Sequence, residues 1–142
     1  MASVLPDPST PFGERVARRL RDERVIWLTT VGGDGRPQPN PVWFHWDGTS
    51  FLVYSLADAR RLANLRRNPK VALHFDGDGQ GGDIVVFAGD ARVSADDPPA
   101  DRVPEFVERY RERMTRVFGD PAGFAARYPV ALRITPTRVR GH

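Results

Sequence analysis

Residues 25–75 constrain the fold of this chain more than any other segment. They contain three runs rich in β-branched and aromatic residues, then a short basic segment with helical spacing, then a fourth strand-like run. Turn signals separate the first three runs, among them Asp34-Gly35 and Asp47-Gly48. This order predicts a small β-barrel that carries an anion-binding corner where the third run meets the basic helix.

The second of these runs begins with alternating prolines. Pro37, Pro39 and Pro41 each remove a backbone N–H donor from one edge of the strand. We therefore expect this strand to pair on one side only, or to be interrupted. From Val42 to Trp46 bulky side chains point to both faces, so we expect both faces to be covered.

The rest of the chain adds strands and peripheral helices. Hydrophobic spacing predicts helices over residues 12–24, 57–67, 102–118 and 122–127. The long helix is expected to turn its core side toward the barrel through Val103, Phe106, Val107, Tyr110, Met114 and Val117. Further strands are predicted over 71–75, 84–93 and 130–135, with 138–142 as a candidate partner of the last.

Length and composition fit one domain. The 142 residues are 40% hydrophobic and 10% aromatic, which is enough for one core. Residues 1–11 are proline-rich and have no periodic pattern, so we predict an N-terminal arm over 1–11 and a single domain over 12–142. No run has the pattern of a signal peptide or the length of a membrane span, and we expect a cytoplasmic protein without a membrane partner.

Charge and residue content argue against several kinds of site. The 21 Lys and Arg are set against 18 Asp and Glu, a mixed surface, and no aromatic residues alternate with the basic helix as a nucleic-acid stacking platform requires. Without cysteine there is no thiolate ligand or cysteine nucleophile. His45, His74 and His142 lack metal-ligand spacing, and the serines lack a nucleophile motif. We expect neither a nucleic-acid partner nor a metal.

The loop at residues 77–82 matches the dinucleotide-binding pattern GxGxxG. That motif follows a strand and opens a helix, whereas a strand-like run follows it here. We interpret the loop as a plain hairpin connection.

Arg60 and Arg61 open the basic helix shortly after a strand that ends in Ser55. Their guanidinium groups, the Ser55 hydroxyl and the first N–H groups of the helix could converge on one phosphate. The residues alone leave a second interpretation open, a solvated basic helix face, because charge runs usually face solvent.

Two stretches resemble the pyridoxamine 5′-phosphate oxidase-like superfamily of split β-barrels. They are Gly35-x-Pro37 through Pro41-Val42-Trp43-Phe44, and SLADARRLANLRRNPKV from Ser55 to Val71. The terminal LRITPTRVRG is similar to the deazaflavin-dependent branch of that superfamily, which uses coenzyme F420. The resemblance spans about residues 12–142 and implies a mainly β fold, the FMN-binding split barrel, with six or seven antiparallel strands and peripheral helices.

The resemblance also implies a homodimer with cofactor sites at the subunit interface. The family's Arg-Lys pair, which contacts the cofactor phosphate, falls on Arg60 and Arg61; arginine at 61 keeps the charge but changes the reach. Ser55 matches the polar residue at the phosphate end. The strand that lines the cofactor ring in relatives matches Asn40, Pro41, Val42, Trp43 and Phe44.

The implied activity is that of an F420-dependent oxidoreductase, which transfers a hydride between the deazaflavin and a conjugated small-molecule substrate. Because the reactive carbon belongs to the cofactor, no catalytic residue is predicted. FMN is the alternative cofactor, since it also has an anionic tail and a planar ring. A protein that binds a cofactor or another ligand without turnover is the third possibility.

Overall fold

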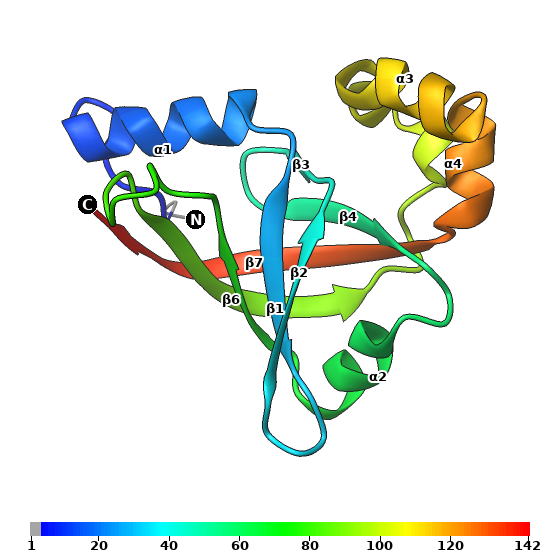
Figure 1. The fold of residues 1–142 in the computed structure, drawn as a ribbon, viewed down its shortest axis with the longest axis horizontal. Helices are drawn as coiled ribbons and strands as arrows, with labels where there is room; N and C mark the ends of the chain where they lie inside the picture. Colours follow the sequence, from blue (N-terminus) through cyan, green and yellow to red (C-terminus); the bar gives the residue numbers. More distant parts are fainter. Residues whose placement is uncertain (1–3) are drawn as a thin grey trace.

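The computed structural model describes residues 4–142, which form one seven-stranded sheet surrounded by helices (Figure 1). The strands are β1 (Ile26–Val31), β2 (Pro37–Val42), β3 (His45–Trp46), β4 (Phe51–Ser55), β5 (Lys70–His74), β6 (Val85–Val93) and β7 (Val130–Gly141). The helices are α1 (Pro11–Asp22), α2 (Arg60–Arg67), the 3₁₀ helix η1 (Ala100–Arg102), α3 (Pro104–Phe118) and α4 (Pro121–Arg127).

All neighbouring strands pair antiparallel, in the order β2-β1-β5-β6-β7-β4-β3. The sheet is strongly curled, and β7 runs across most of its length (Figure 1). Strands β2 and β3, which are close in sequence, form its two edges. The prediction of a split β-barrel with six or seven antiparallel strands and peripheral helices is confirmed.

The proline-rich run forms an edge strand, as predicted. β2 pairs only with β1, with Pro37 opposite Val31 and Pro41 opposite Trp27. β2 ends at Val42 and the chain changes partner before β3 begins, so the second predicted strand is interrupted. Prolines that lack an N–H are compatible with an edge, where one side of the backbone needs no partner.

Two hydrophobic clusters hold the fold together. The first fills the barrel and lies against α1, with side chains that include Val16, Ile26, Phe44, Phe51, Val53, Phe87 and Leu132. The second lies between the outer face of β4 and β7 and the layer formed by η1, α3 and α4, and it includes Leu52, Tyr54, Phe106, Tyr110, Met114 and Phe124. Alternate side chains of β4 enter the two clusters, which explains why the whole strand is buried.

Helix α3 lies on the outer face of the barrel, and its core side is formed largely as predicted. Phe106, Tyr110 and Met114 are each at most 1% exposed. Val117 is the exception, because it is 63% exposed. It lies in the last turn of α3 and lines a pocket described below.

The prediction that residues 130–135 and 138–142 are two paired strands is wrong. They form one strand, β7, which pairs with β4 through its first half and with β6 along most of its length. Pro136 is accommodated by a register shift between Ala88 and Gly89 of β6. A Cβ atom at Gly89 would lie 2.6 Å from the Thr135 carbonyl oxygen and 3.1 Å from the Pro136 Cα. Glycine at 89 therefore allows the strand to pass through the proline without breaking.

The first two α-helices differ from the prediction at one or both ends: α1 begins one residue earlier and ends two residues earlier, and α2 begins three residues later. Thr10 caps α1 by accepting a hydrogen bond from the Gly13 N–H at 3.0 Å, and α1 ends at Asp22. α2 begins at Arg60, after a turn, and Ala59 supplies no side-chain cap. Its predicted buried face is present, because Leu62 and Leu65 are both 6% exposed. Within residues 4–142 no helix has the length and apolar character needed to cross a membrane.

Candidate functional site

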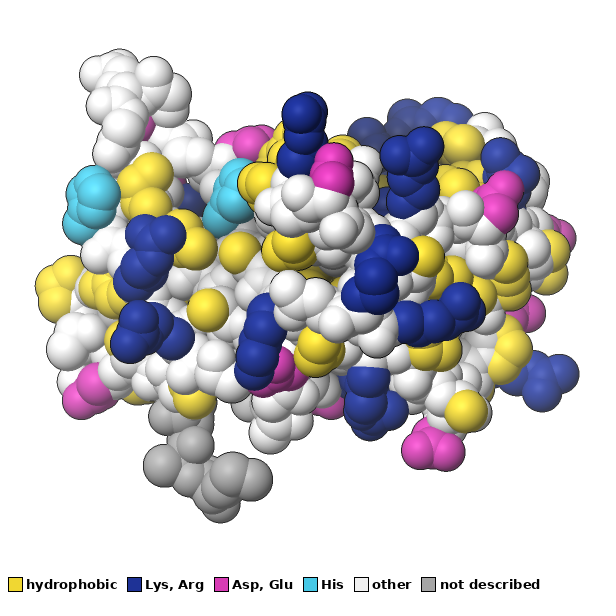
Figure 2. Space-filling view, turned by 90° about the horizontal axis from the view of Figure 1, so that it is seen from below, with side chains coloured by type: hydrophobic (Ala, Val, Ile, Leu, Met, Phe, Trp, Pro, Cys, Tyr) yellow, Lys and Arg dark blue, Asp and Glu magenta, His cyan; other side chains and the backbone are white. Residues whose placement is uncertain are grey.

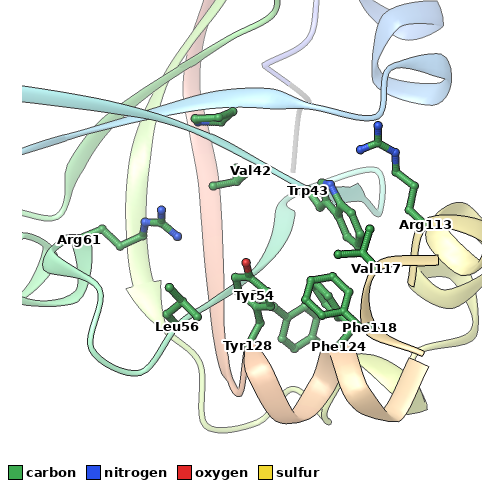
Figure 3. Close-up of a pocket in the computed structure, with 11 residues that line it drawn as sticks. Val42, Trp43, Tyr54, Leu56, Arg61, Arg113, Val117, Phe118, Phe124 and Tyr128 are labelled. Atoms are coloured by element: carbon green, nitrogen blue, oxygen red, sulfur yellow. The ribbon is translucent and has the colours of Figure 1, made fainter. Parts of the chain in front are cut away.

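A pocket of about 330 Å³ lies between the end of β2, the end of β4 and the pair of helices α3 and α4 (Figure 3). It is lined by Pro41, Val42, Trp43, Tyr54, Leu56, Arg61, Arg113, Val117, Phe118, Phe124 and Tyr128. Most of these side chains are aromatic or aliphatic, and both charged ones are arginines. Such a pocket is suited to a flat, apolar body that carries a negative charge.

The aromatic wall of the pocket is organised around Trp43. Its ring stacks on Tyr110, with centroids 4.6 Å apart, and on Phe124, with centroids 4.9 Å apart. Phe118 meets the edge of the indole, and Tyr128 stacks on Phe124. These mutual contacts restrain each ring, so the wall is rigid before any ligand arrives.

The Tyr110 hydroxyl fixes the backbone beside Trp43. It accepts a hydrogen bond from the Phe44 N–H at 2.8 Å and lies 2.8 Å from the Arg24 carbonyl oxygen. Burial raises the pKa of Tyr110, which keeps the hydroxyl neutral and able to donate. The link between β2 and β3 is thereby tied to α3.

Arg61 forms the basic corner of the pocket, at the side opposite α3 (Figure 3). Its side chain is half-buried, and one guanidinium nitrogen lies 3.4 Å from the hydroxyl oxygen of the fully buried Ser55. Within residues 4–142 no carboxylate pairs with it. Desolvation lowers the pKa of Arg61, as expected for a partly buried cation without a counter-ion.

A second hollow, of about 400 Å³, adjoins the pocket and shares Arg61 with it. Its lining residues are Gln38, Pro39, Asn40, Ala59, Arg60 and Arg61. Arg60 is exposed and forms no ion pair within the described part of the chain. The two arginines at the start of α2 therefore line this pair of hollows, called the trough below, which can hold an anion at this end and a ring at the other.

The structure brings most of the sequence-predicted site residues to this trough. Those that line the aromatic pocket are Pro41, Val42, Trp43 and Arg61, and those that line the adjoining hollow are Asn40, Arg60 and again Arg61. Ser55 lies beneath the Arg61 guanidinium and donates its own hydroxyl hydrogen to the Leu56 carbonyl at 3.0 Å. Phe44 is separate from them, because its side chain is fully buried in the barrel core.

Sequence reasoning did not assign the wall contributed by α3 and α4 to the site. The missed residues of this wall are Arg113, Val117, Phe118, Phe124 and Tyr128, and Tyr54 and Leu56 at the end of β4 were missed as well. One usable signal was the density of aromatic residues on both sides of the helix break at Gly119. Helical spacing favours a core role for such residues, and only the tertiary position of α4 shows that they face a cavity.

Solved structures with this fold include proteins of different kinds. A conserved hypothetical protein from Mycobacterium tuberculosis is 25% identical with a TM-score of 0.70, over 99% of this chain and 86% of that chain. An F420 reductase is 23% identical with a TM-score of 0.66, over 87% and 94% respectively. The heme storage protein HutZ from Vibrio cholerae is 18% identical with a TM-score of 0.62, over 90% and 92%. The likenesses below 25% identity show a common fold.

A family model assigns the chain more firmly than these structural likenesses. The model described as pyridoxamine 5′-phosphate oxidase matches residues 12–142, which include every strand of the barrel and the whole trough. The match and the split-barrel fold agree, and the chain belongs to the pyridoxamine 5′-phosphate oxidase family.

Proposed function

We propose that this protein is an F420-dependent oxidoreductase whose cofactor lies in the trough between Arg60 and Trp43. When bound, the deazaflavin would supply hydride transfer to or from a conjugated small-molecule substrate. The observation that carries the proposal is the partly buried Arg61 guanidinium, which has the Ser55 hydroxyl beside it and no carboxylate partner within residues 4–142.

A buried cation without a counter-ion costs free energy, and an anionic ligand would remove that cost. Arg61 can donate two parallel hydrogen bonds to a phosphate, and the neighbouring Arg60 can add a second positive charge. In this proposal Ser55 fixes the Arg61 side chain from below, through the contact at 3.4 Å. The chemistry of this donor set fits a phosphate.

The ring of the cofactor is assigned to the strand segment from Asn40 to Phe44. Trp43 would offer its indole as a rigid side wall, whereas Phe44 would contribute through its backbone because its side chain is buried. These residues bind and orient the two reactants and exclude water, which is the main contribution of a protein to hydride transfer. No side chain is assigned a proton-transfer role.

FMN is the alternative cofactor, and one titration separates the two. We expect purified protein to quench F420 fluorescence with micromolar affinity and to bind FMN more weakly. Tighter binding of FMN, or a yellow protein with a flavin spectrum on purification, would assign the site to FMN. If the protein binds neither cofactor with micromolar affinity, the proposed function is wrong.

A second candidate function is ligand binding without turnover, which the likeness to a heme storage protein favours. The rigid aromatic pocket suits any planar ligand, whether it reacts or not. A tight complex whose reduced cofactor shows no absorbance change with a panel of electron acceptors would support this candidate over the first.

We further propose a homodimer in the cytoplasm, with the trough completed at the subunit interface. In this proposal residues 12–142 act as one domain and residues 1–11 as an arm. Of the arm, residues 4–11 are described, and Leu5 lies against the barrel core beside α1. Sedimentation equilibrium would test the dimer, and a species of about 16 kDa, the mass of one chain, would contradict it.

A further inference from the structure

Arg113 lies across the aromatic pocket from Arg61, and the proposed cofactor contacts do not use it. Figure 3 shows the two arginines on opposite sides, with the aromatic side chains between them. Arg113 is exposed and forms no hydrogen bond or ion pair within residues 4–142. Its guanidinium group is therefore available to bind a ligand at the edge of the apolar pocket.

The surroundings of Arg113 are strongly basic. It also lines a hollow of about 200 Å³ together with Arg24, Arg109, Tyr110, Glu112 and Arg116, where Glu112 is the one acid. Arg109 is committed to the fold, because its guanidinium donates to the backbone carbonyls of Arg21 and Glu23. Arg116 lies one turn from Arg113 and is equally without an ion pair in the described chain.

Apolar surface is exposed beside this charge. Val117, four residues after Arg113 and on the same side of α3, is 63% exposed and lines the pocket. Figure 2 shows another face of the molecule, seen from below, where Lys and Arg side chains are spread across the surface with exposed apolar side chains between them. A ligand that covers Val117 would bring a substituent at its end within reach of Arg113.

We propose that the α3 side of the pocket selects substrates with a planar apolar body and one carboxylate or sulfonate, and that Arg113 determines this specificity. The inference rests on the proposed function, in which Arg61 is taken by the cofactor phosphate. A cationic substrate would be repelled by Arg113, and a neutral one would gain nothing from it. A carboxylate can receive two guanidinium hydrogen bonds there.

The test uses cofactor-free protein and two probes of the same shape, 2-naphthoate and 2-naphthamide, with binding measured by calorimetry. We expect naphthoate to bind about fivefold more tightly, the scale of a partly exposed ion pair. Because Arg61 is also free in this protein, Arg113→Gln is made in the Arg61→Gln background, where it should abolish this preference. Arg111→Gln is the matched control, since Arg111 is on the same helix and does not line the pocket or the basic hollow.

A parallel measurement in Arg61→Gln separates the two arginines. The preference for naphthoate should persist in that variant. The inference is overturned if neither probe binds at millimolar concentration, if wild type binds both equally, or if the preference survives Arg113→Gln in the Arg61→Gln background. Loss of the preference in Arg61→Gln alone would also overturn it, while leaving the phosphate assignment intact. The proposed function itself is tested by a different experiment, the titration with F420 and FMN.

Discussion

The indole of Trp43 lies flat on the phenol ring of Tyr110, with ring centroids 4.6 Å apart and an angle of 1° between the planes. The same tyrosine accepts the backbone N–H of Phe44 at 2.8 Å. One residue of α3 therefore controls both the side chain and the backbone of the segment proposed to line the cofactor ring.

Tyr110→Phe should destabilise the protein by about 1–3 kcal/mol, because the buried Phe44 N–H loses its acceptor while the ring contact with Trp43 is retained. Urea unfolding followed by tryptophan fluorescence measures this loss. Tyr128→Phe is the control, since within residues 4–142 the Tyr128 hydroxyl forms no hydrogen bond. This variant should change the free energy of unfolding by no more than about 0.5 kcal/mol. Equal stability of Tyr110→Phe and wild type would contradict the structural role of the hydroxyl.

Gly89→Ala should destabilise the barrel by about 1–3 kcal/mol through overpacking. The new Cβ would meet backbone atoms of Thr135 and Pro136, which cannot move without breaking the pairing of β6 with β7. Thermal and urea unfolding both report the change. Ala88→Ser, at the exposed neighbouring position, provides the comparison and should be close to neutral. If Gly89→Ala is as stable as that control, the close approach at the bulge does not constrain the residue.

Most strands and helices of this chain follow from local pattern, and so does the basic corner. Alternating prolines in β2 indicate an edge strand, and hydrophobic spacing identifies α2 and α3, because both signals depend only on neighbouring residues. Local sequence pattern could not predict that β7 is one continuous strand. Pro136 has the local character of a strand breaker, and the glycine that accommodates it lies far away in the sequence.

The two ends of the candidate site also differ in how far the sequence predicts them. Ser55, Arg60 and Arg61 are close in sequence, so a phosphate corner could be proposed from spacing. The burial of Arg61 and the absence of a carboxylate partner for it among residues 4–142 depend on tertiary contacts, as does the wall formed by Phe124 and its neighbours. Aromatic residues on short helices have the same spacing whether they fill a core or face a cavity.

Stability should fall in acid partly through Asp97. Hydrogen bonds from Arg133, at 2.6 and 2.9 Å, lower the pKa of this carboxyl below its ordinary value. A carboxylate with a lowered pKa stabilises the fold above its unfolded-state pKa, and this contribution is lost as the pH falls through the folded-state pKa. The free energy of unfolding of wild type should therefore decrease below about pH 4.

Asp97→Asn should reduce stability at pH 7 by about 1–3 kcal/mol and should make the decrease in acid shallower. Unfolding curves collected from pH 7 to pH 3 measure both effects. Asp58→Asn serves as control, because Asp58 is exposed and forms no ion pair in the described residues. An acid dependence identical in Asp97→Asn and wild type would refute the contribution of this ion pair.

The central claim, that Arg60 and Arg61 hold a cofactor phosphate, is tested most directly by calorimetric titration of F420 into three proteins. Arg60→Ala/Arg61→Ala should bind at least about tenfold more weakly than wild type, the scale of one charge-assisted hydrogen bond, while its circular dichroism and unfolding midpoint remain nearly unchanged. Arg66→Ala, an exposed arginine on the same helix, should bind like wild type. Unchanged affinity in the double variant would contradict the account.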